Sequence, residues 1–154
     1  MPDFKISINI KQPSDIVWKA FIDPENMLHY TKYLEKVEVV QGKFGEIGAI
    51  AHLHYLEKGR SYILEDKLVD YEEGEKIGSQ VSGQGMVIDV ENQFESVSEG
   101  TKMTLSWNGT SKSFLTGIIL KLMQKKIKEH AREELLTFKQ LTEEYGFKFL
   151  AKKD

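Results

Sequence analysis

The stretch TKMTLSWNGTSKSFLTGIILKLM, residues 101–123, contains the change of pattern that decides the fold. In its first half, Met103, Leu105 and Trp107 alternate with polar residues, which predicts a strand with one buried face. From Ser113 the spacing of apolar residues lengthens to about three and a half, which predicts a long amphipathic helix. The chain therefore passes from sheet to helix at this point.

The helix that begins after Ser113 has an apolar stripe, which we expect to cover the sheet. The stripe consists of Leu115, Ile118, Ile119, Leu122, Met123, Ile127, Ala131, Leu135, Phe138, Leu141 and Tyr145. Gly146 is expected to end the helix, because glycine adopts the conformation of a C-cap readily. Residues 147–154 are expected to be loosely ordered.

Upstream of residue 101 the pattern predicts a strand, two short helices and further strands. Phe4 to Ile10 alternates apolar and polar residues, and Ser14 and Asp23 can each cap a short helix. Strand patterns separated by turns, such as Glu57–Arg60, then continue to about residue 110. Alternating strands need cover on one face only, and the long helix supplies it. The fold class is α+β, with a curved antiparallel sheet of about seven strands around the C-terminal helix.

Composition describes a soluble protein of one domain. The chain has 154 residues, 40% of them hydrophobic and 29% charged, with a net charge of −3. We expect a single domain over residues 1–154 with a core of about 4–145, in the cytoplasm, without a signal peptide. The absence of cysteine excludes disulfides and thiolate chemistry. We expect no nucleic-acid partner and no stable membrane insertion, because the apolar run 114–120 is too short to span a bilayer.

The chain resembles the START-like superfamily, also called SRPBCC, which includes polyketide cyclase/dehydrase and lipid-transport proteins. The resemblance spans roughly Phe4 to Tyr145, and its most specific piece is P-x-x-x-V-W from Pro13 to Trp18, followed by Asp23-Pro24-Glu25. Its further segments are the glycine-containing residues 42–48, LVDYEEGEKI, GTKMTLSW and EELLTFKQLTEE. The resemblance implies a helix-grip fold with an apolar cavity between sheet and helix. Members bind lipids, sterols, polyketides or plant hormones, and some are enzymes, without a shared catalytic triad.

The segment AHLHYLEKGR, residues 51–60, raises the question of a metal site. A turn at Lys58-Gly59 pairs Leu53 with Leu64, Tyr55 with Tyr62 and His52 with Glu65. The more apolar face, which contains Leu53 and Tyr55, should then line the cavity, while His52 and His54 point outward. A metal site would recruit both histidines and Glu65, but no further ligand follows from the spacing, so we expect no metal. A shift of one residue in register would exchange the two faces.

The cavity wall can be assigned from the residues that share the inward face. We expect it to contain Leu53, Tyr55, Tyr62, Leu64, Met86, Ile88, Trp107, Ile118, Leu122 and Met123. Asp66 shares this face, and burial there would raise its pKa and make it an acid–base group. Alternatively, Asp66 lies at a strand end and is paired with a charge or a backbone amide. His29, Tyr30 and Tyr33 form a possible gate, or the two tyrosines simply cover the helix.

A basic stripe follows on the long helix at Lys121, Lys125, Lys128 and Arg132. It suits an anionic membrane or a phosphate-bearing ligand, but Glu129 and Glu133 interleave with it, so we favour a solvated face. We expect no long exposed apolar patch, which counts against a protein-interaction module.

Three functions remain after the sequence is considered. The favoured one is non-catalytic binding of a small hydrophobic or amphipathic molecule, lipid-like or polyketide-like, in the cavity, without a cofactor. The second is a cyclase- or dehydratase-like enzyme in which Asp66 with Tyr55 or Tyr62 transfers protons. The third is a domain that acts on a protein partner.

Overall fold

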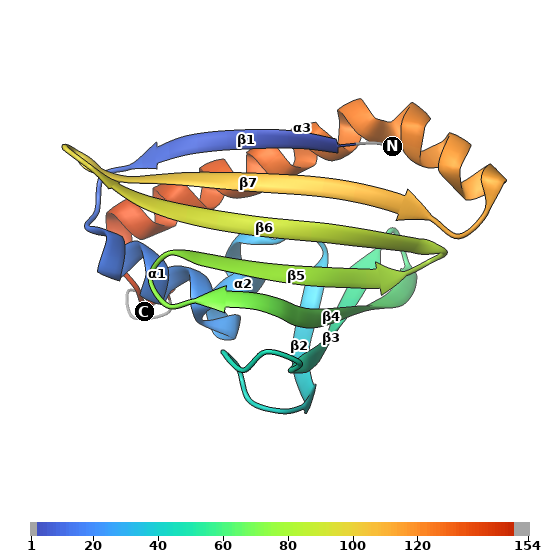
Figure 1. Ribbon diagram of the computed structural model, residues 1–154, viewed down its shortest axis with the longest axis horizontal. Coiled ribbons are helices and arrows are strands. Elements are labelled where there is room, and N and C mark those ends of the chain that lie inside the picture. The colour runs from blue at the N-terminus through green and yellow to red at the C-terminus, as the bar shows by residue number, and fades with distance from the viewer. Residues whose placement is uncertain (1–2, 150–154) are drawn as a thin grey trace.

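Seven strands form one antiparallel sheet in the computed structural model, which describes residues 3–149 (Figure 1). The strands are β1 (Asp3–Ile10), β2 (Leu34–Gln41), β3 (Ile50–Glu57), β4 (Arg60–Glu72), β5 (Lys76–Gly83), β6 (Met86–Val97) and β7 (Gly100–Ser111). Their order in the sheet is β1-β7-β6-β5-β4-β3-β2, so each strand after the first pairs with its successor in the chain, and β7 also pairs with β1. The α+β class and the strand count predicted from the sequence are confirmed.

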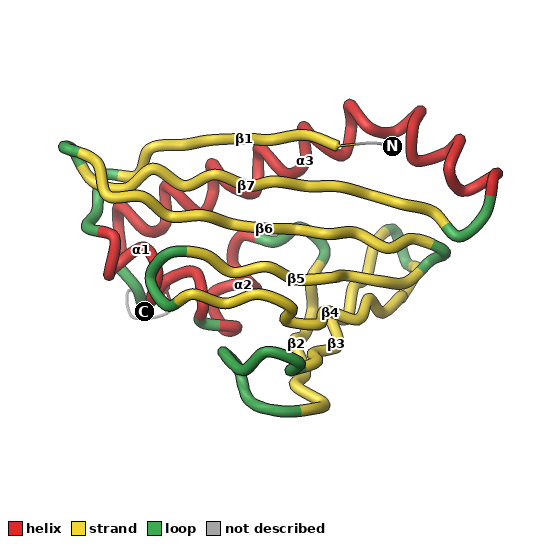
Figure 2. The backbone as a smooth tube through the Cα atoms, in the orientation of Figure 1, coloured by secondary structure: helices red, strands yellow, loops and turns green. Residues whose placement is uncertain are grey.

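Three helices complete the fold: α1 (Ser14–Ile22), α2 (Pro24–Tyr30) and α3 (Phe114–Tyr145). The carboxylate of Asp23 accepts from the backbone N–H of Glu25 at 3.0 Å and caps α2. Ser113 caps α3, and Gly146 ends it with φ of 74°. Figure 2 shows α3 running along one side of the sheet, with α1 and α2 beside its C-terminal half.

The hairpin of β3 and β4 has the register predicted from its turn. Leu53 lies opposite Leu64, Tyr55 opposite Tyr62, and His52 opposite Glu65. Because side chains alternate along a strand, this register decides which of these residues face α3.

Aromatic side chains from α1, α2 and α3 pack together in the core. Phe138 of α3 is fully buried and meets Phe21 and Tyr30 edge-on, with ring centroids 5.6 and 5.0 Å apart. Trp18 packs edge-on against Phe94 at 5.3 Å. Trp18, the last residue of the P-x-x-x-V-W segment, therefore stabilises the core, since aromatic pairs contribute more than their buried area alone.

The chain after α3 is anchored by a buried asparagine. The side-chain amide of Asn26 donates to the carbonyls of Ala20 and Phe147 at 3.0 and 2.9 Å, and its oxygen accepts from the N–H of Phe149 at 3.2 Å. Phe149 is only 4% exposed. The expectation of a loosely ordered tail is therefore wrong up to Phe149, because Asn26 satisfies the backbone there; residues 150–154 lie outside the described part.

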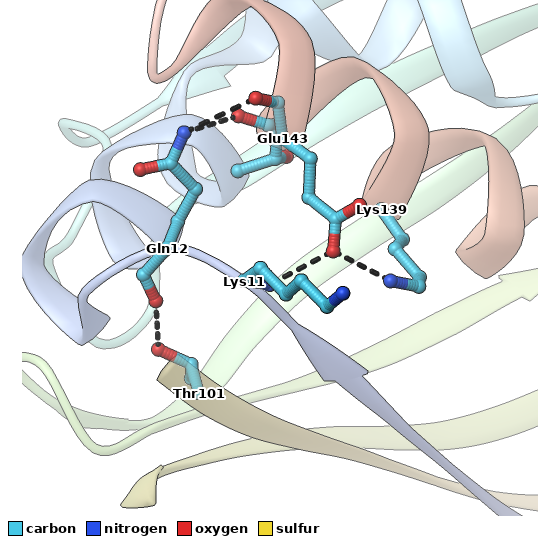
Figure 3. Close-up of polar contacts among 6 residues, drawn as sticks. Lys11, Gln12, Thr101, Lys139 and Glu143 are labelled. Atoms are coloured by element: carbon cyan, nitrogen blue, oxygen red, sulfur yellow. Dashed lines mark hydrogen bonds and ion pairs between the residues drawn. The ribbon is translucent and has the colours of Figure 1, made fainter. Parts of the chain in front are cut away.

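The end of α3 is fastened to the connection between β1 and α1 (Figure 3). Glu143 accepts from the backbone N–H of Lys11 at 2.8 Å, and the Gln12 side chain donates to the carbonyl of Thr142 at 3.0 Å. The hydroxyl of Thr101 donates to the carbonyl of Gln12 at 2.8 Å. The carbonyl of Thr142 also accepts from the N–H of Gly146 at 2.9 Å, so the Gln12 bond adds to the helix cap, and together these bonds hold the end of α3 against the β1–α1 connection.

The beginning of α3 departs from the predicted stripe. Leu120, Leu135 and Phe138 are buried and define the inward side of the helix, whereas Leu115 and Leu122 are 73% and 79% exposed. At 3.6 residues per turn, Leu122 lies about 200° round the helix from Leu120, so the two cannot face the same way. The prediction that the apolar stripe faces the sheet is therefore wrong for the first turns of α3. The expectation that no long apolar patch is exposed is also wrong, because the outward residues of these turns form one.

Gly100 allows the close approach of β7 to β1, and its replacement should destabilise the fold. Its φ is 144°, and an added Cβ would lie 2.2 Å from the carbonyl oxygen of Ile10. We expect Gly100→Ala to lower the free energy of unfolding by about 3 kcal/mol or more in urea denaturation. Gly74→Ala is the control, since Gly74 also has positive φ but a Cβ added there would meet no atom of residues 3–149 within 4 Å beyond its chain neighbours; it should cost about 1 kcal/mol. Equal losses would contradict the steric explanation.

Candidate functional site

A cavity of about 390 Å³ lies between the sheet and α3, a volume typical of small-molecule sites. Strands β2 to β7 form most of its wall, and α2, α3 and Phe44 in the β2–β3 connection close it. Most of its lining is apolar and includes Phe21, Val37, Val39, Ala51, Leu53, Leu64, Leu68, Ile77, Val81, Ile88, Val90, Leu105, Trp107, Ile127 and Leu135. Such a wall favours ligands with a large apolar surface.

Five of the ten residues expected in the wall do line the cavity: Leu53, Tyr55, Leu64, Ile88 and Trp107. All five lie on strands. The period-two pattern and the hairpin register were therefore sufficient to place them, because both specify the side of the sheet directly.

The other five expected wall residues lie outside the cavity lining: Tyr62, Met86, Ile118, Leu122 and Met123. Tyr62 lies near the tip of the β3–β4 hairpin, where its ring stacks on Tyr55 at 5.1 Å and its hydroxyl donates to Glu57 at 3.3 Å. Met86 is the first residue of β6, beside a turn. The three residues on α3 are exposed because the inward side of the helix is set by Leu120.

The three residues of the possible gate are separated in the structure. Tyr30 lines the cavity and packs on Phe138, so it covers α3 as well as facing the cavity. His29 is exposed, with its ring edge-on to Phe149 at 6.4 Å, and Tyr33 is 42% exposed. Of the three, only Tyr30 is positioned to touch a molecule in the cavity.

The two histidines of β3 are not among the cavity-lining residues. His54 forms a hydrogen bond with Glu38 of β2, with Nε2 and Oε1 3.0 Å apart, and His52 lies opposite Glu65. Within residues 3–149, no three His, Asp or Glu side chains are placed to hold a metal ion together. Each histidine thus lies beside an acidic residue of a neighbouring strand, as in cross-strand polar pairs on a sheet.

Asp66 faces the cavity from β4, as the strand pattern predicts. Burial raises its pKa, because a low-dielectric surrounding disfavours the charged carboxylate; a hydrogen bond with the Ser79 side chain acts in the opposite direction. Asp66 therefore has the environment of an acid–base group, and it is not paired with a lysine among the ion pairs of the described residues.

A second acid, Glu134 of α3, lines the cavity and was missed in the sequence. It accepts from the backbone N–H of Lys32 at 3.0 Å. Burial is the main cause that raises its pKa to about 7, from an ordinary value of 4.5. His130, one turn earlier, also faces the cavity. His130 and Glu134 follow Ile127 at successive intervals of three and four residues, so the helical spacing by itself predicted that they lie on the inward side of α3.

Asn92 of β6 is the third polar group that the sequence analysis missed. It is 6% exposed and lines the cavity, and its Oδ1 has no hydrogen-bond partner within the described residues. Its position two residues after Val90 places it on the inward face, so the alternation also pointed to it. A buried acceptor without a partner is costly, and a ligand that donates a hydrogen bond would relieve that cost.

Several polar groups of the cavity are acids or hydrogen-bond acceptors. Asp66 and Glu134 are acids, and the Oδ1 of Asn92 is an acceptor that no group of residues 3–149 donates to. Burial also raises the pKa of Tyr55 and of Tyr30, so both phenols stay neutral at physiological pH. The cavity can accept hydrogen bonds and exchange protons, and it repels negative charge whenever its acids are ionised.

Comparison with known protein families shows the family to which this chain belongs. A family model described as polyketide cyclase / dehydrase and lipid transport matches residues 1–143. No curated protein matches the chain at a significant level.

Solved structures share the fold at low sequence identity. Protein CV1439 from Chromobacterium violaceum is 13% identical with a TM-score of 0.75, and the match covers 93% of this chain and 99% of that one. An AHSA1-like protein from Aeromonas hydrophila is 17% identical with a TM-score of 0.68, covering 95% of both chains. The di-domain ARO/CYC StfQ of the steffimycin biosynthetic pathway is 12% identical with a TM-score of 0.76, covering 93% of this chain and 51% of that one. These likenesses establish the fold.

The raised pKa of Glu134 predicts a pH dependence of stability. Between about pH 4.5 and 7 the folded state binds more protons than the unfolded state, so stability falls as the pH rises through this window. The fall should reach up to about 3 kcal/mol. Glu134→Gln should remove it in urea denaturation at several pH values.

Glu133→Gln is the matched control for this measurement. Glu133 neighbours Glu134, forms an ion pair with Lys32 outside the cavity, and has a lowered pKa. It should keep the wild-type slope above pH 4.5. If the Glu134 variant keeps that slope as well, Glu134 is ionised in the fold and the assignment is wrong.

Proposed function

Since this chain belongs to the polyketide cyclase / dehydrase and lipid transport family, we propose that it binds a small, largely apolar molecule between the sheet and α3. The single observation that carries this proposal is the cavity of about 390 Å³. Its volume lies in the range of small-molecule sites. Apolar surface removed from water, at about 25 cal/mol per Å², would supply most of the affinity.

The polar groups of the cavity restrict the chemistry of this ligand. Asp66 and Glu134 disfavour an anion such as a fatty-acid carboxylate, and Asn92 offers an unused acceptor. A neutral molecule with a hydroxyl or amine donor satisfies Asn92 and avoids repulsion by the acids. We therefore infer an amphipathic ligand whose polar end donates hydrogen bonds.

Matched probes test this ligand class. Decanol and decanoate share one alkyl chain and differ in charge, and both can displace fluorescent N-phenylnaphthylamine from the cavity. At pH 8, where Glu134 with a pKa of about 7 is mostly ionised, we expect decanol to bind about ten-fold more tightly than decanoate. The difference should shrink as the pH falls below 7. Tighter binding of decanoate would contradict the inference.

A pair of identical substitutions separates cavity binding from surface adsorption. Val81 lines the cavity, while Val69 on β4 is 45% exposed outside it. Val81→Phe should weaken decanol binding about ten-fold by occupying part of the cavity, and Val69→Phe should leave it unchanged. Equal effects would place the ligand elsewhere.

A second candidate function is favoured by one observation, the placement of Asp66 inside the cavity beside an apolar wall. A carboxyl with a raised pKa can transfer protons in a cyclase- or dehydratase-like reaction. Tyr55 also lines the cavity and is a partner for this chemistry, whereas Tyr62 lies outside the cavity lining and its hydroxyl donates to Glu57. Binding without turnover remains the proposal, because the hydrogen bond that Asp66 forms is with Ser79, and among the described residues none joins Asp66 to Tyr55.

Asp66→Asn separates binding from catalysis. The wild type and the variant would be purified from the native host, and the molecules released from each would be weighed by mass spectrometry. A carrier should release the same molecule from both proteins. If the molecule from the variant is heavier by one water than the molecule from the wild type, Asp66 acts in a dehydration. That result would contradict the proposal of binding without turnover and support the enzyme.

A further inference from the structure

Six large apolar side chains are exposed on the first turns of α3, and we call them the α3 apolar face. They are Phe114, Leu115, Ile118, Ile119, Leu122 and Met123. Their exposed fractions run from 42% to 83%, although residues of this type are usually buried. None of them lines the cavity, so the proposed ligand site does not account for them.

The α3 apolar face is a continuous strip that covers about half of the helix circumference and is centred on the side opposite Leu120. It consists of two rows at intervals of four residues, one starting at Phe114 and one at Leu115, which neighbour each other on the helix surface. Leu120, 3% exposed, marks the opposite side, which packs on the fold. Figure 1 shows the first turns of α3 extending beyond the N-terminal end of β1.

Positive charge surrounds this strip in an otherwise acidic chain. Residues 112–128 contain five lysines and no Asp or Glu, whereas the whole chain has a net charge of −3. The lysines are Lys112, Lys121, Lys125, Lys126 and Lys128. All except the half-buried Lys128 are exposed. Lysine stems can lie along an apolar surface while the ammonium group reaches a charged layer above it.

We propose that the first turns of α3 dock on the surface of an anionic lipid membrane. The α3 apolar face enters the boundary between headgroups and acyl chains, and the lysines around it contact acidic headgroups. The docking is interfacial and reversible. Across the part of the chain that the structure describes, no helix is long and apolar enough to cross a membrane.

The charge pattern selects a membrane over a second copy of the chain. A symmetric dimer through this strip would bring Lys121 and Lys125 of one copy close to those of the other, which is repulsive. An anionic bilayer offers both the apolar layer and the opposite charge. The acidic residues nearest in sequence on α3, Glu129 and Glu133, lie beyond the strip toward the C-terminus.

Co-sedimentation of the full-length protein with vesicles tests the proposal. We expect binding to vesicles that contain phosphatidylserine, and binding at least ten-fold weaker to vesicles of phosphatidylcholine alone. Added salt should weaken the first binding, because it screens the lysines. Lys121→Gln with Lys125→Gln should weaken it further, by roughly five-fold for each lysine.

Leu122→Glu tests the apolar contribution, since Leu122 is 79% exposed and its replacement leaves the core intact. We expect it to lower binding to anionic vesicles by about ten-fold or more. Ile47→Glu is the matched control: Ile47 is 66% exposed in the β2–β3 connection and should not affect binding. Circular dichroism and unfolding curves of each variant verify that the fold is kept.

Several results would overturn the proposal. They are an absence of vesicle binding, equal binding to neutral and anionic vesicles, or equal losses in the Leu122 and Ile47 variants. Light scattering that shows a dimer in solution, converted to a monomer by Leu122→Glu, would assign the strip to self-association instead. None of these residues lines the cavity, so the probe-displacement experiment tests ligand binding in the cavity independently of membrane docking.

Discussion

The structure depends on one constraint: a single helix must cover the inner face of a seven-stranded sheet. With strands about 4.8 Å apart, such a sheet is about 29 Å wide, whereas a helix with its side chains is about 10 Å across. The sheet therefore has to bend around α3, and α1 and α2 fill one end, where Phe21 and Tyr30 pack on Phe138 and Trp18 packs on Phe94. Beside these aromatic side chains, a cavity of about 390 Å³ remains between the sheet and α3.

The cavity is thus a consequence of packing, and its chemistry is set by the few polar residues that reach it. Asp66 comes from the sheet and Glu134 from α3, and burial raises the pKa of both. Asn92 keeps a buried acceptor that has no partner in the described part of the chain. Groups of this kind lower stability, so their presence beside an apolar wall is typical of a ligand site, where binding supplies the missing partners.

The same constraint explains the exposed end of α3. A helix of 32 residues is about 48 Å long, whereas the eight residues of β1 span about 26 Å. A helix anchored at its C-terminal end by Gln12 and Glu143 must extend past the strand it packs against. Its first turns are therefore free of the core, and their apolar residues are available to a partner outside the chain.

The sequence by itself determined the element order, the strand faces and the register of β3 with β4. It could do so because alternation and turn chemistry are local, and they placed Leu53, Tyr55, Leu64, Asp66, Ile88 and Trp107 correctly on the inner face. The spacing of α3 also contained Glu134 and His130, which we missed because only apolar residues were followed along the stripe. The direction of Ile118, Leu122 and Met123 was decided by tertiary structure alone. An apolar run around the whole helix fits either orientation, and the choice depends on where the sheet ends and which residue, here Leu120, meets it.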